Sequence, residues 1–225
     1  MSRRAAEEKI KKRLVKVNGV VAELGLRIDP GHDTVEYNGK RVLPDGEDKC
    51  YVMLNKPRGF VTTLSDEKAR HTVAELVSGV KTRVWPVGRL DMDSDGLLLM
   101  TNDGELTNRL THPRHEIPKI YHVTVSGKVA SDTLEALSRP MIIDGYEILP
   151  VKVRELGFDG SSTLLEFTLC EGRNRQIRKM CDTQGLKISR LCRVAVGELS
   201  LGSLALGKWR YLSSEEVDYL RGHTK

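Results

Sequence analysis

The chain has 225 residues, 30% of them charged, and a net charge of +5 at pH 7. This length allows one or two domains whose core needs no disulfide or metal ion. The sequence has no run of ~18 apolar residues that could form a transmembrane helix, and its charged first residues lack the apolar segment of a signal peptide. The four cysteines show no paired metal-ligand spacing, which indicates reduced thiols rather than a zinc site and predicts a cytoplasmic protein.

The positive charge is concentrated in two segments. Residues 1–16 contain seven basic and two acidic residues, and residues 171–193 contain the same numbers. The rest of the chain is therefore net acidic. Two basic segments on an acidic body are typical of a protein that binds a polyanion such as nucleic acid. From charge alone, two solvated helix faces explain the pattern equally well.

The first 43 residues are expected to form a small separate domain. Residues 3–13 predict an amphipathic helix with Ser2 as its N-cap. Two strand-like runs, each containing Asn-Gly, follow at 14–21 and 34–40 and predict β-hairpins. The polar residues 44–49 then predict a linker to the next domain.

Residues 50–225 are expected to form a second, larger domain. Its predicted strands lie at 51–54, 97–101, 120–126, 151–156, 163–169 and 194–197. Its predicted helices lie at 72–77, 103–111, 131–137, 173–184 and 214–221. Because strands and helices do not alternate regularly, we predict an α+β fold with a largely antiparallel mixed sheet flanked by helices.

The segment GRLDMDSDGLLLM, residues 88–100, places three aspartates at alternate positions. Its aspartates and glycine match the first half of a helix–loop–helix calcium loop. The twelfth position of such a loop requires a glutamate, and here it is Asn102. Pro86 also prevents the entering helix that this motif needs. The sequence therefore argues against calcium.

Two interpretations of this segment remain open. It is either a solvated surface loop or a turn between two core strands that presents one carboxylate into a cleft, as a nucleophile requires. Arg89 lies two residues before Asp91 and is expected to keep that carboxylate ionised. Asp93 and Asp95 are expected to be polar loop residues that shape the turn.

Further polar motifs have both functional and ordinary interpretations. EGRNRQIRKM, residues 171–180, predicts a helix whose basic side chains contact phosphates or an acidic partner, or else a basic solvated helix. LNKPRG, residues 54–59, ends a strand in a basic turn that is otherwise an ordinary β-turn. His112 and His115 indicate surface or RNA contacts rather than a metal site, and no motif indicates a cofactor.

These segments together resemble one family. LNKPRG, GRLDMDSDGLLLMTNDGEL, KIYHVTV and EGRNRQIRKM occur in this order, and over residues 50–220 the chain closely resembles bacterial ribosomal RNA pseudouridine synthases of the RsuA/RluB type. Residues 1–43 resemble the small α/β RNA-binding domain shared with ribosomal protein S-four. That domain usually has one more helix before its Ser-Arg-Arg, so the resemblance implies a domain that is shortened at its N-terminus.

The resemblance implies an isomerase that converts a specific uridine of ribosomal RNA to pseudouridine, in the large subunit rather than the small. Asp91 matches the invariant aspartate, which attacks C1′ as a nucleophile or assists loss of the C2′ proton. Tyr121 matches the tyrosine that packs on the target base, and Arg178 the active-site basic residue, expected to pair with Asp91. The family's reaction uses no cofactor or metal. The competing class is a non-catalytic RNA-binding protein, which has no need of these three residues together.

The expected partner is ribosomal RNA, free or in a subunit precursor, and the chain is expected to act as a monomer without contact to a membrane. Basic residues from both expected domains are candidates for phosphate contacts. The predicted RNA-binding residues are Arg3, Arg4, Lys11, Lys12, Arg13, Lys56, Arg58, Arg89, Arg173, Arg175 and Lys179.

Overall fold

The computed structural model describes residues 3–43, 48–112, 114 and 116–222. The chain divides into two compact units, residues 1–48 and 49–225. Ser2, His115 and residues 44–47 of the expected linker lie outside the described residues. Within the described part of the chain, no helix is both long and apolar enough to cross a membrane.

The first unit combines one helix with a small sheet of strand order β2-β1-β3-β4. Asn18 and Gly19 connect its first hairpin with φ angles of 50° and 81°, and Asn38 and Gly39 do the same in the second. Positive φ at both central residues is what a tight hairpin turn requires, so both predicted hairpins are confirmed. The elements are α1 (Arg3–Lys11), β1 (Val15–Val17), β2 (Val20–Val21), β3 (Val35–Tyr37) and β4 (Lys40–Val42).

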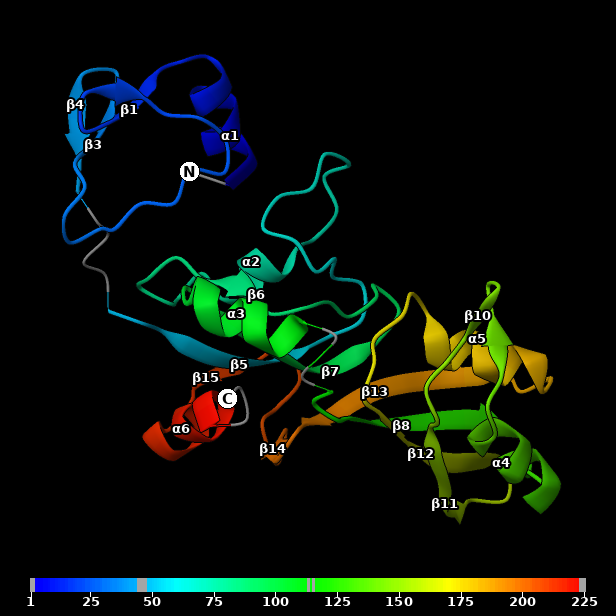
Figure 1. Cartoon of the computed structure of the whole chain (residues 1–225). Coiled ribbons are helices and arrows are strands. Elements are labelled where there is room, and N and C mark those ends of the chain that lie inside the picture. Colours follow the sequence, from blue (N-terminus) through cyan, green and yellow to red (C-terminus); the bar gives the residue numbers. More distant parts are fainter. Residues whose placement is uncertain (1–2, 44–47, 113, 115, 223–225) are drawn as a thin grey trace. The chain divides into compact units, whose positions relative to one another are not determined.

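The second unit is built on one large sheet (Figure 1), whose main path has the order β11-β12-β8-β13-β7-β5-β15. Along this path only the central pair β13–β7 is parallel, which confirms a largely antiparallel mixed sheet. A separate two-stranded hairpin is formed by β9 and β10. The strands are β5 (Tyr51–Lys56), β6 (Trp85–Pro86), β7 (Asp95–Thr101), β8 (Lys119–Ser126), β9 (Ile142–Ile143), β10 (Tyr146–Glu147), β11 (Lys152–Phe158), β12 (Ser162–Leu169), β13 (Ile188–Val196), β14 (Leu199–Ser200) and β15 (Trp209–Tyr211).

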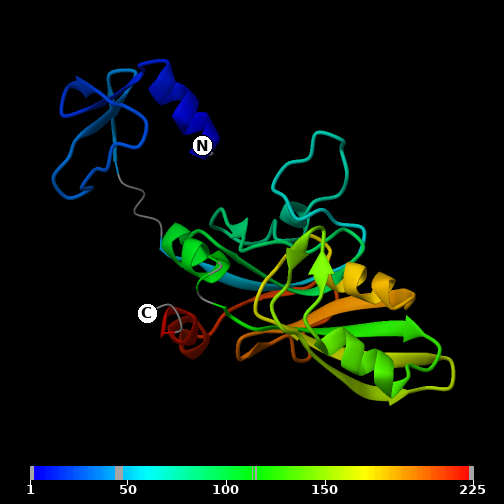
Figure 2. The same cartoon turned by 45° about the vertical axis from the view of Figure 1, so that its right-hand side comes forward.

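Helices cover both faces of this sheet, and three apolar clusters form the core. Side chains of α3 and α6 pack with Met53, Leu97 and Leu99 on one face of β5 and β7, while α2 packs with Leu54 and Leu98 on the other. The half of the sheet around β8 and β12 forms the third cluster with α4 and α5. Figure 2 shows α5 beside the β9–β10 hairpin. The helices are α2 (Val73–Leu76), α3 (Gly104–Thr111), α4 (Ser131–Ser138), α5 (Gln176–Thr183) and α6 (Ser214–Gly222).

Two predicted boundaries are wrong. The strand expected at 194–197 is β13, which begins at Ile188, because its arginines interrupt the apolar pattern that marks a buried strand. The helix expected at 173–184 begins only at Gln176, because Arg175 has a φ of 52° and cannot be part of a right-handed helix. The short strands β6, β9, β10, β14 and β15 were not predicted either.

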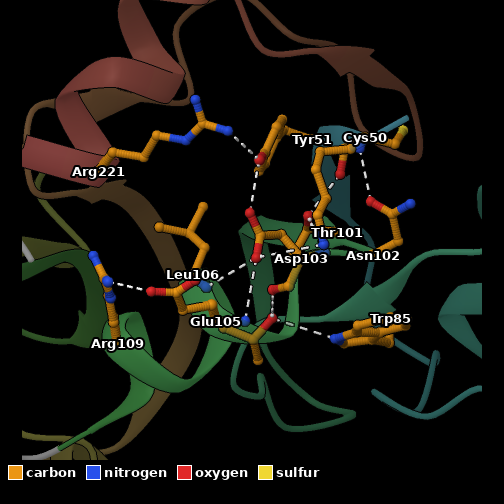
Figure 3. A network of polar contacts seen from close by, with 12 residues as sticks. Cys50, Tyr51, Trp85, Thr101, Asn102, Asp103, Glu105, Leu106, Arg109 and Arg221 are labelled. Carbon is orange, nitrogen blue, oxygen red and sulfur yellow. Dashed lines mark hydrogen bonds and ion pairs between the residues drawn. The ribbon is translucent and has the colours of Figure 1, made fainter. Parts of the chain in front are cut away.

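A polar network joins β5, α3 and α6, as Figure 3 shows. Asp103 caps α3 by accepting the backbone N–H groups of Glu105 and Leu106. The hydroxyl of Tyr51 donates to Asp103 Oδ2 at 2.8 Å, and Arg221 donates to that hydroxyl at 2.8 Å. The start of α3 and the end of α6 are therefore both fixed to the first strand of the large sheet.

Candidate active site

The second unit contains a cleft of about 640 Å³ between the ends of β7, β8 and β13 and the start of α5. All three predicted catalytic residues, Asp91, Tyr121 and Arg178, line it. They come from three segments far apart in the sequence. Three of the predicted RNA-binding residues line the same cleft: Arg89, Arg173 and Arg175.

The loop that carries Asp91 is held from two sides by buried polar side chains. The hydroxyl of Thr62 donates to the carbonyl oxygen of Leu90 at 2.6 Å and lies 3.2 Å from its backbone nitrogen. The ammonium of Lys56 donates to the carbonyl oxygen of Asp91 at 2.9 Å. The Asp91 side chain remains 36% exposed in the cleft. The fold therefore fixes the backbone of this aspartate and leaves its carboxylate accessible.

Lys56 was predicted to contact RNA, and the structure corrects this. Its side chain is 0% exposed, and its Nζ also donates to the carbonyl oxygens of Pro57 and Ser94 at 3.1 and 2.9 Å. Burial lowers the pKa of Lys56 to about 8, although the negative charges of nearby aspartates act to raise it. All three N–H groups of the ammonium thus have protein acceptors, and this lysine organises the loop from beneath.

Close packing between β7 and β13 explains Gly96. Its φ is +109°, and a Cβ built there would lie 2.2 Å from the carbonyl oxygen of Arg193. Gly96 is paired with Arg193 in the parallel ladder between these strands. Glycine alone fits this backbone conformation and this approach. The glycine after the three aspartates therefore lets the Asp91 loop run directly against β13.

The second aspartate of the loop is bound by two arginines. Arg175 Nη1 and Nη2 donate to the two carboxylate oxygens of Asp93 at 3.1 and 3.0 Å. Arg178 Nη2 lies 3.3 Å from the same carboxylate and donates to the backbone carbonyl oxygen of Asp93 at 3.0 Å. Burial opposes the charge of Asp93, but the hydrogen bonds from Arg175 and the charges of both arginines outweigh burial and lower the pKa of this carboxyl.

These contacts correct the predicted pairing of Arg178 with Asp91. Arg178 holds the Asp93 carboxylate, its backbone and the Ser94 hydroxyl, to which it donates at 3.2 Å. The cation nearest the Asp91 carboxylate is Arg175, at 3.5 Å. Arg89, expected to hold Asp91 ionised, is exposed and has no polar partner within the described part of the chain.

The third aspartate is not the loop residue that we predicted. Asp95 begins β7 and is 4% exposed. Its Oδ2 accepts a hydrogen bond from Arg190 of β13 at 3.0 Å, while Oδ1 is buried and accepts no hydrogen bond from any described residue. Since separate arginines hold Asp93 and Asp95, the three carboxylates do not converge. Among the described residues, no group of His, Cys, Asp and Glu side chains could hold a metal ion.

Tyr121 lies at the middle of the sheet, where the two halves of the core meet. Its neighbours in the ladder are Phe167 on β12 and Arg193 on β13. The ring packs against two of the three apolar clusters and also lines the cleft. An aromatic ring fixed in this way provides a flat apolar surface on the cleft wall, in the same cavity as Asp91.

The other predicted RNA-binding residues lie in several places. Arg58 is exposed and donates to the carbonyl oxygen of Ser189 at 2.8 Å. Lys179 pairs with Asp144 of the β9–β10 turn. The five predicted residues of the first unit, Arg3, Arg4, Lys11, Lys12 and Arg13, are all exposed.

Several cleft residues were not predicted from the sequence. Glu171 accepts hydrogen bonds from Arg173 and Gln176 and so fixes the segment before α5; an acid at the start of a basic segment is the signal that could have shown this. Lys119 and Arg193 also line the cleft, and both lie in strands rather than in a basic cluster. No pattern in the sequence distinguished them from other surface cations.

Comparison with known proteins agrees with this geometry. The profile of the family described as RNA pseudouridylate synthase matches residues 50–183, more than half of the chain. The chain belongs to this family. It is therefore an RNA pseudouridine synthase, an isomerase that acts on RNA, and the predicted enzyme class is confirmed.

Individual relatives of this RNA pseudouridine synthase match over almost its whole length. An uncharacterized RNA pseudouridine synthase of Aquifex aeolicus is 42% identical over 97% of the chain and 88% of the relative. Ribosomal large subunit pseudouridine synthase B of Bacillus subtilis is 40% identical over 98% of the chain and 90% of the relative. A crystal structure of a pseudouridylate synthase superposes with a TM-score of 0.71 at 29% identity, covering 98% of this chain and 94% of that one. The pseudouridine synthase fold is thereby confirmed.

Proposed function

We propose that this enzyme converts one uridine of large-subunit ribosomal RNA to pseudouridine, with Asp91 as the catalytic nucleophile. The observation that carries the assignment of Asp91 is its place in the cleft: Lys56 holds its backbone and Thr62 that of Leu90, while the Asp91 carboxylate stays accessible. The name of the Bacillus subtilis relative supports the large subunit as the target.

The reaction exchanges one bond of the nucleotide for another. The bond between N1 of uracil and C1′ of ribose breaks, the uracil turns, and C5 forms the new bond to C1′ while C5 loses its proton. Attack of the Asp91 carboxylate on C1′ would expel the uracil as an anion and hold the sugar as an ester until C5 displaces the carboxylate. No redox change or external energy source is needed. The requirement on the protein is to keep the free uracil in place.

Tyr121 meets this second requirement. Its ring is held by two core clusters and faces the cleft, so it would stack on the uracil during the rotation. Within the described part of the chain, its hydroxyl donates no hydrogen bond. This hydroxyl is available to assist removal of the C5 proton.

Arg175, just before α5, and Arg178, within α5, would support Asp91 in different ways. Arg175 Nη1 lies 3.5 Å from Asp91 Oδ2 and would help to hold the carboxylate in place in the cleft. Arg178 would position the loop by holding Asp93 and Ser94. Their roles are thus distributed differently from those that the resemblance implied, since Arg178 would act on Asp91 indirectly.

The target nucleotide must leave its base stack to enter the cleft, and unstacking one base costs on the order of a few kcal/mol. Phosphate contacts of the exposed cations Arg58, Arg89 and Arg173 would offset this cost. We further propose that the first unit is an RNA-binding domain, on the strength of the exposed basic residues at 3–13. We expect the substrate to be ribosomal RNA, either free or in a subunit precursor. We expect the enzyme to act as a monomer.

Mapping pseudouridine in ribosomal RNA from cells with and without the gene tests the assignment of the substrate. We expect one large-subunit position to lose its pseudouridine in the deletion strain and to regain it when the gene is restored. Loss at a small-subunit position would refute the assignment to the large subunit. An unchanged map of both ribosomal RNAs would refute ribosomal RNA as the substrate.

A further inference from the structure

Two cations on the inner wall of the cleft were not among the predicted RNA-binding residues. Lys119 lies on β8 and Arg193 on the adjacent β13 (Figure 1). Tyr121 is two residues beyond Lys119 and directly opposite Arg193 in the ladder. Side chains two apart on a strand, and those directly opposite in a ladder, share a face of the sheet. Lys119, Tyr121 and Arg193 therefore form a row on the wall of the cleft, and all three line it.

Arg193 is a buried charge with few partners. Its side chain belongs to a residue that is 6% exposed, and its Nε donates to the carbonyl oxygen of Leu97 at 2.8 Å. The described part of the chain offers its two terminal nitrogens no hydrogen-bond acceptor and no carboxylate within 4.0 Å. A buried guanidinium is normally paired. Arg193 lines the cleft, so a ligand bound there could supply the missing acceptors.

Lys119 adds a second positive charge beside the first. Its Nζ reaches the carbonyl oxygen of Cys170 only at 3.5 Å, and no described carboxylate lies within 4.0 Å of it. Burial lowers the pKa of Lys119, and the charge of Arg193 lowers it further. The charge of Arg193 also opposes protonation of Lys56. Like charges thus lie close together here, and among the described residues no carboxylate lies within 4.0 Å of either cation.

Three other arginines of the cleft differ in this respect. Arg175 and Arg178 are bound to Asp93, and Arg173 is bound to Glu171. These carboxylates offset their charges in part. Arg89 has no polar partner among the described residues but is exposed to solvent, whereas Lys119 and Arg193 lie on the inner wall of the cleft.

We propose that Lys119 and Arg193 form an anion subsite that binds a phosphate group of the RNA adjacent to the target uridine. The proposal rests on the proposed function, because it takes RNA as the occupant of the cleft. A guanidinium fork and an ammonium are both strong phosphate ligands. The uracil ring carries no full charge, whereas each nucleotide brings one negative phosphodiester. Positions two apart on a strand are separated by roughly 6.6 Å, so a base on Tyr121 and the phosphate of the same nucleotide can be bound together.

A titration of the full-length protein with inorganic phosphate tests the subsite without RNA. Amide ¹H–¹⁵N shifts are followed at constant ionic strength for the wild type, Lys119→Met and Lys128→Met. Lys128→Met is the matched control, because it removes the same charge from an exposed position outside the cleft. We expect saturable shifts on β8 and β13 in the wild type and the control, and at least about fivefold weaker binding in Lys119→Met. Lys119→Arg should restore phosphate binding.

Equal phosphate affinity in Lys119→Met and Lys128→Met would overturn the subsite, as would shifts confined to residues outside the cleft. Turnover on ribosomal RNA from a strain that lacks the gene provides the second readout. Lys119→Met should raise KM more than it lowers kcat, and should lower the slope of log affinity against log salt by about one. A variant with an unchanged KM and salt slope would refute the phosphate contact in RNA.

The two measurements separate this proposal from the proposed function. Phosphate binding that depends on Lys119, in an enzyme that modifies no ribosomal RNA, would uphold the subsite and refute the substrate. Modification of ribosomal RNA by an enzyme whose phosphate binding ignores Lys119 would refute the subsite and uphold the substrate.

Discussion

The ammonium of Lys56 donates a hydrogen bond to the backbone carbonyl oxygen of Asp91 at 2.9 Å. The lysine is fully buried, and its two other hydrogen bonds go to the carbonyl oxygens of Pro57, the next residue in the chain, and of Ser94 in the Asp91 loop. Three carbonyl oxygens from two segments converge on one cation. The position of the aspartate in the cleft therefore depends on a charge that RNA does not reach.

Replacing Lys56 by methionine should destabilise the second unit and impair the reaction. Methionine fills a similar volume but leaves three carbonyl oxygens without a donor, which should lower the free energy of unfolding by about 2–4 kcal/mol. Urea denaturation followed by tryptophan fluorescence measures this, because both tryptophans, Trp85 and Trp209, lie in the second unit. Lys128→Met is the control, and an equal stability of the two variants would contradict the role of Lys56.

The stabilising effect of Lys56 should also depend on pH. Burial lowers its pKa from 10.5 to about 8. Between these two values the unfolded chain binds a proton that the folded state has lost, so the free energy of unfolding rises with pH through this window. The contribution is at most about 1.4 kcal/mol per pH unit, and Lys56→Met lacks it. The unfolding free energy of the wild type minus that of the variant should therefore increase from about pH 7.5 to about pH 9.5, by at most about 1.4 kcal/mol per pH unit. A constant difference would contradict the lowered pKa.

Gly96→Ala should be among the most damaging small substitutions in the chain. The added Cβ would meet the carbonyl oxygen of Arg193 at 2.2 Å, in a backbone conformation that alanine rarely adopts. We expect a loss of about 3 kcal/mol or more in the free energy of unfolding. Gly157→Ala on β11 is the control, since its Cβ would meet nothing within 4 Å. Similar urea midpoints for both variants would show that β7 and β13 can move apart with little loss of stability, and would contradict this prediction.

Arg178→Met tests whether the loop must be held from the side of α5. The variant loses the contacts to Asp93 and Ser94, so the Asp91 carboxylate should shift, and a shift of about 1 Å can lower kcat about 100-fold. The affinity for RNA should change much less than kcat. Single-turnover rates of pseudouridine formation separate the two effects.

Arg154→Met provides the comparison for this experiment. Arg154 also pairs with a carboxylate, that of Glu166, but on the edge of the sheet and 69% exposed. Its replacement should leave single-turnover rates within about twofold, because exposed ion pairs contribute little. Equal rates for both arginine variants would contradict a positioning role for Arg178.

Features that depend on residues close together in the sequence could be predicted, whereas features that depend on distant residues could not. The Asn-Gly hairpins of the first unit and helices such as α3 follow from local rules and were predicted, although the role of Asp103 as the cap of α3 was not. The strand β13 was predicted too short, because Arg190 and Arg193 look like surface residues until their partners Asp95 and Leu97 are known. Those partners are about 95 residues away in the chain.

The active-site residues could likewise be predicted only in part. The resemblance to a known family implied that Asp91, Tyr121 and Arg178 share one active site, and the structure does bring them together in one cleft. Their pairing could not be predicted. Whether Arg178 meets Asp91 or Asp93 depends on the turn at Arg175 and on the approach of β7 to β13, and neither has a local signature. Lys56 was misassigned for the same reason, since a lysine before Pro-Arg-Gly looks exposed in the sequence.

Pseudouridine formation by Asp91→Asn tests the central claim most directly. Asparagine keeps the size of the side chain and the backbone contacts of Lys56 while removing the nucleophilic carboxylate. The account predicts no detectable pseudouridine in ribosomal RNA from a strain that lacks the gene, with RNA affinity within a few-fold of the wild type. Asp93→Asn should retain measurable turnover in the same assay. Pseudouridine formed by Asp91→Asn at a rate comparable to the wild type would contradict the role of Asp91 as the nucleophile.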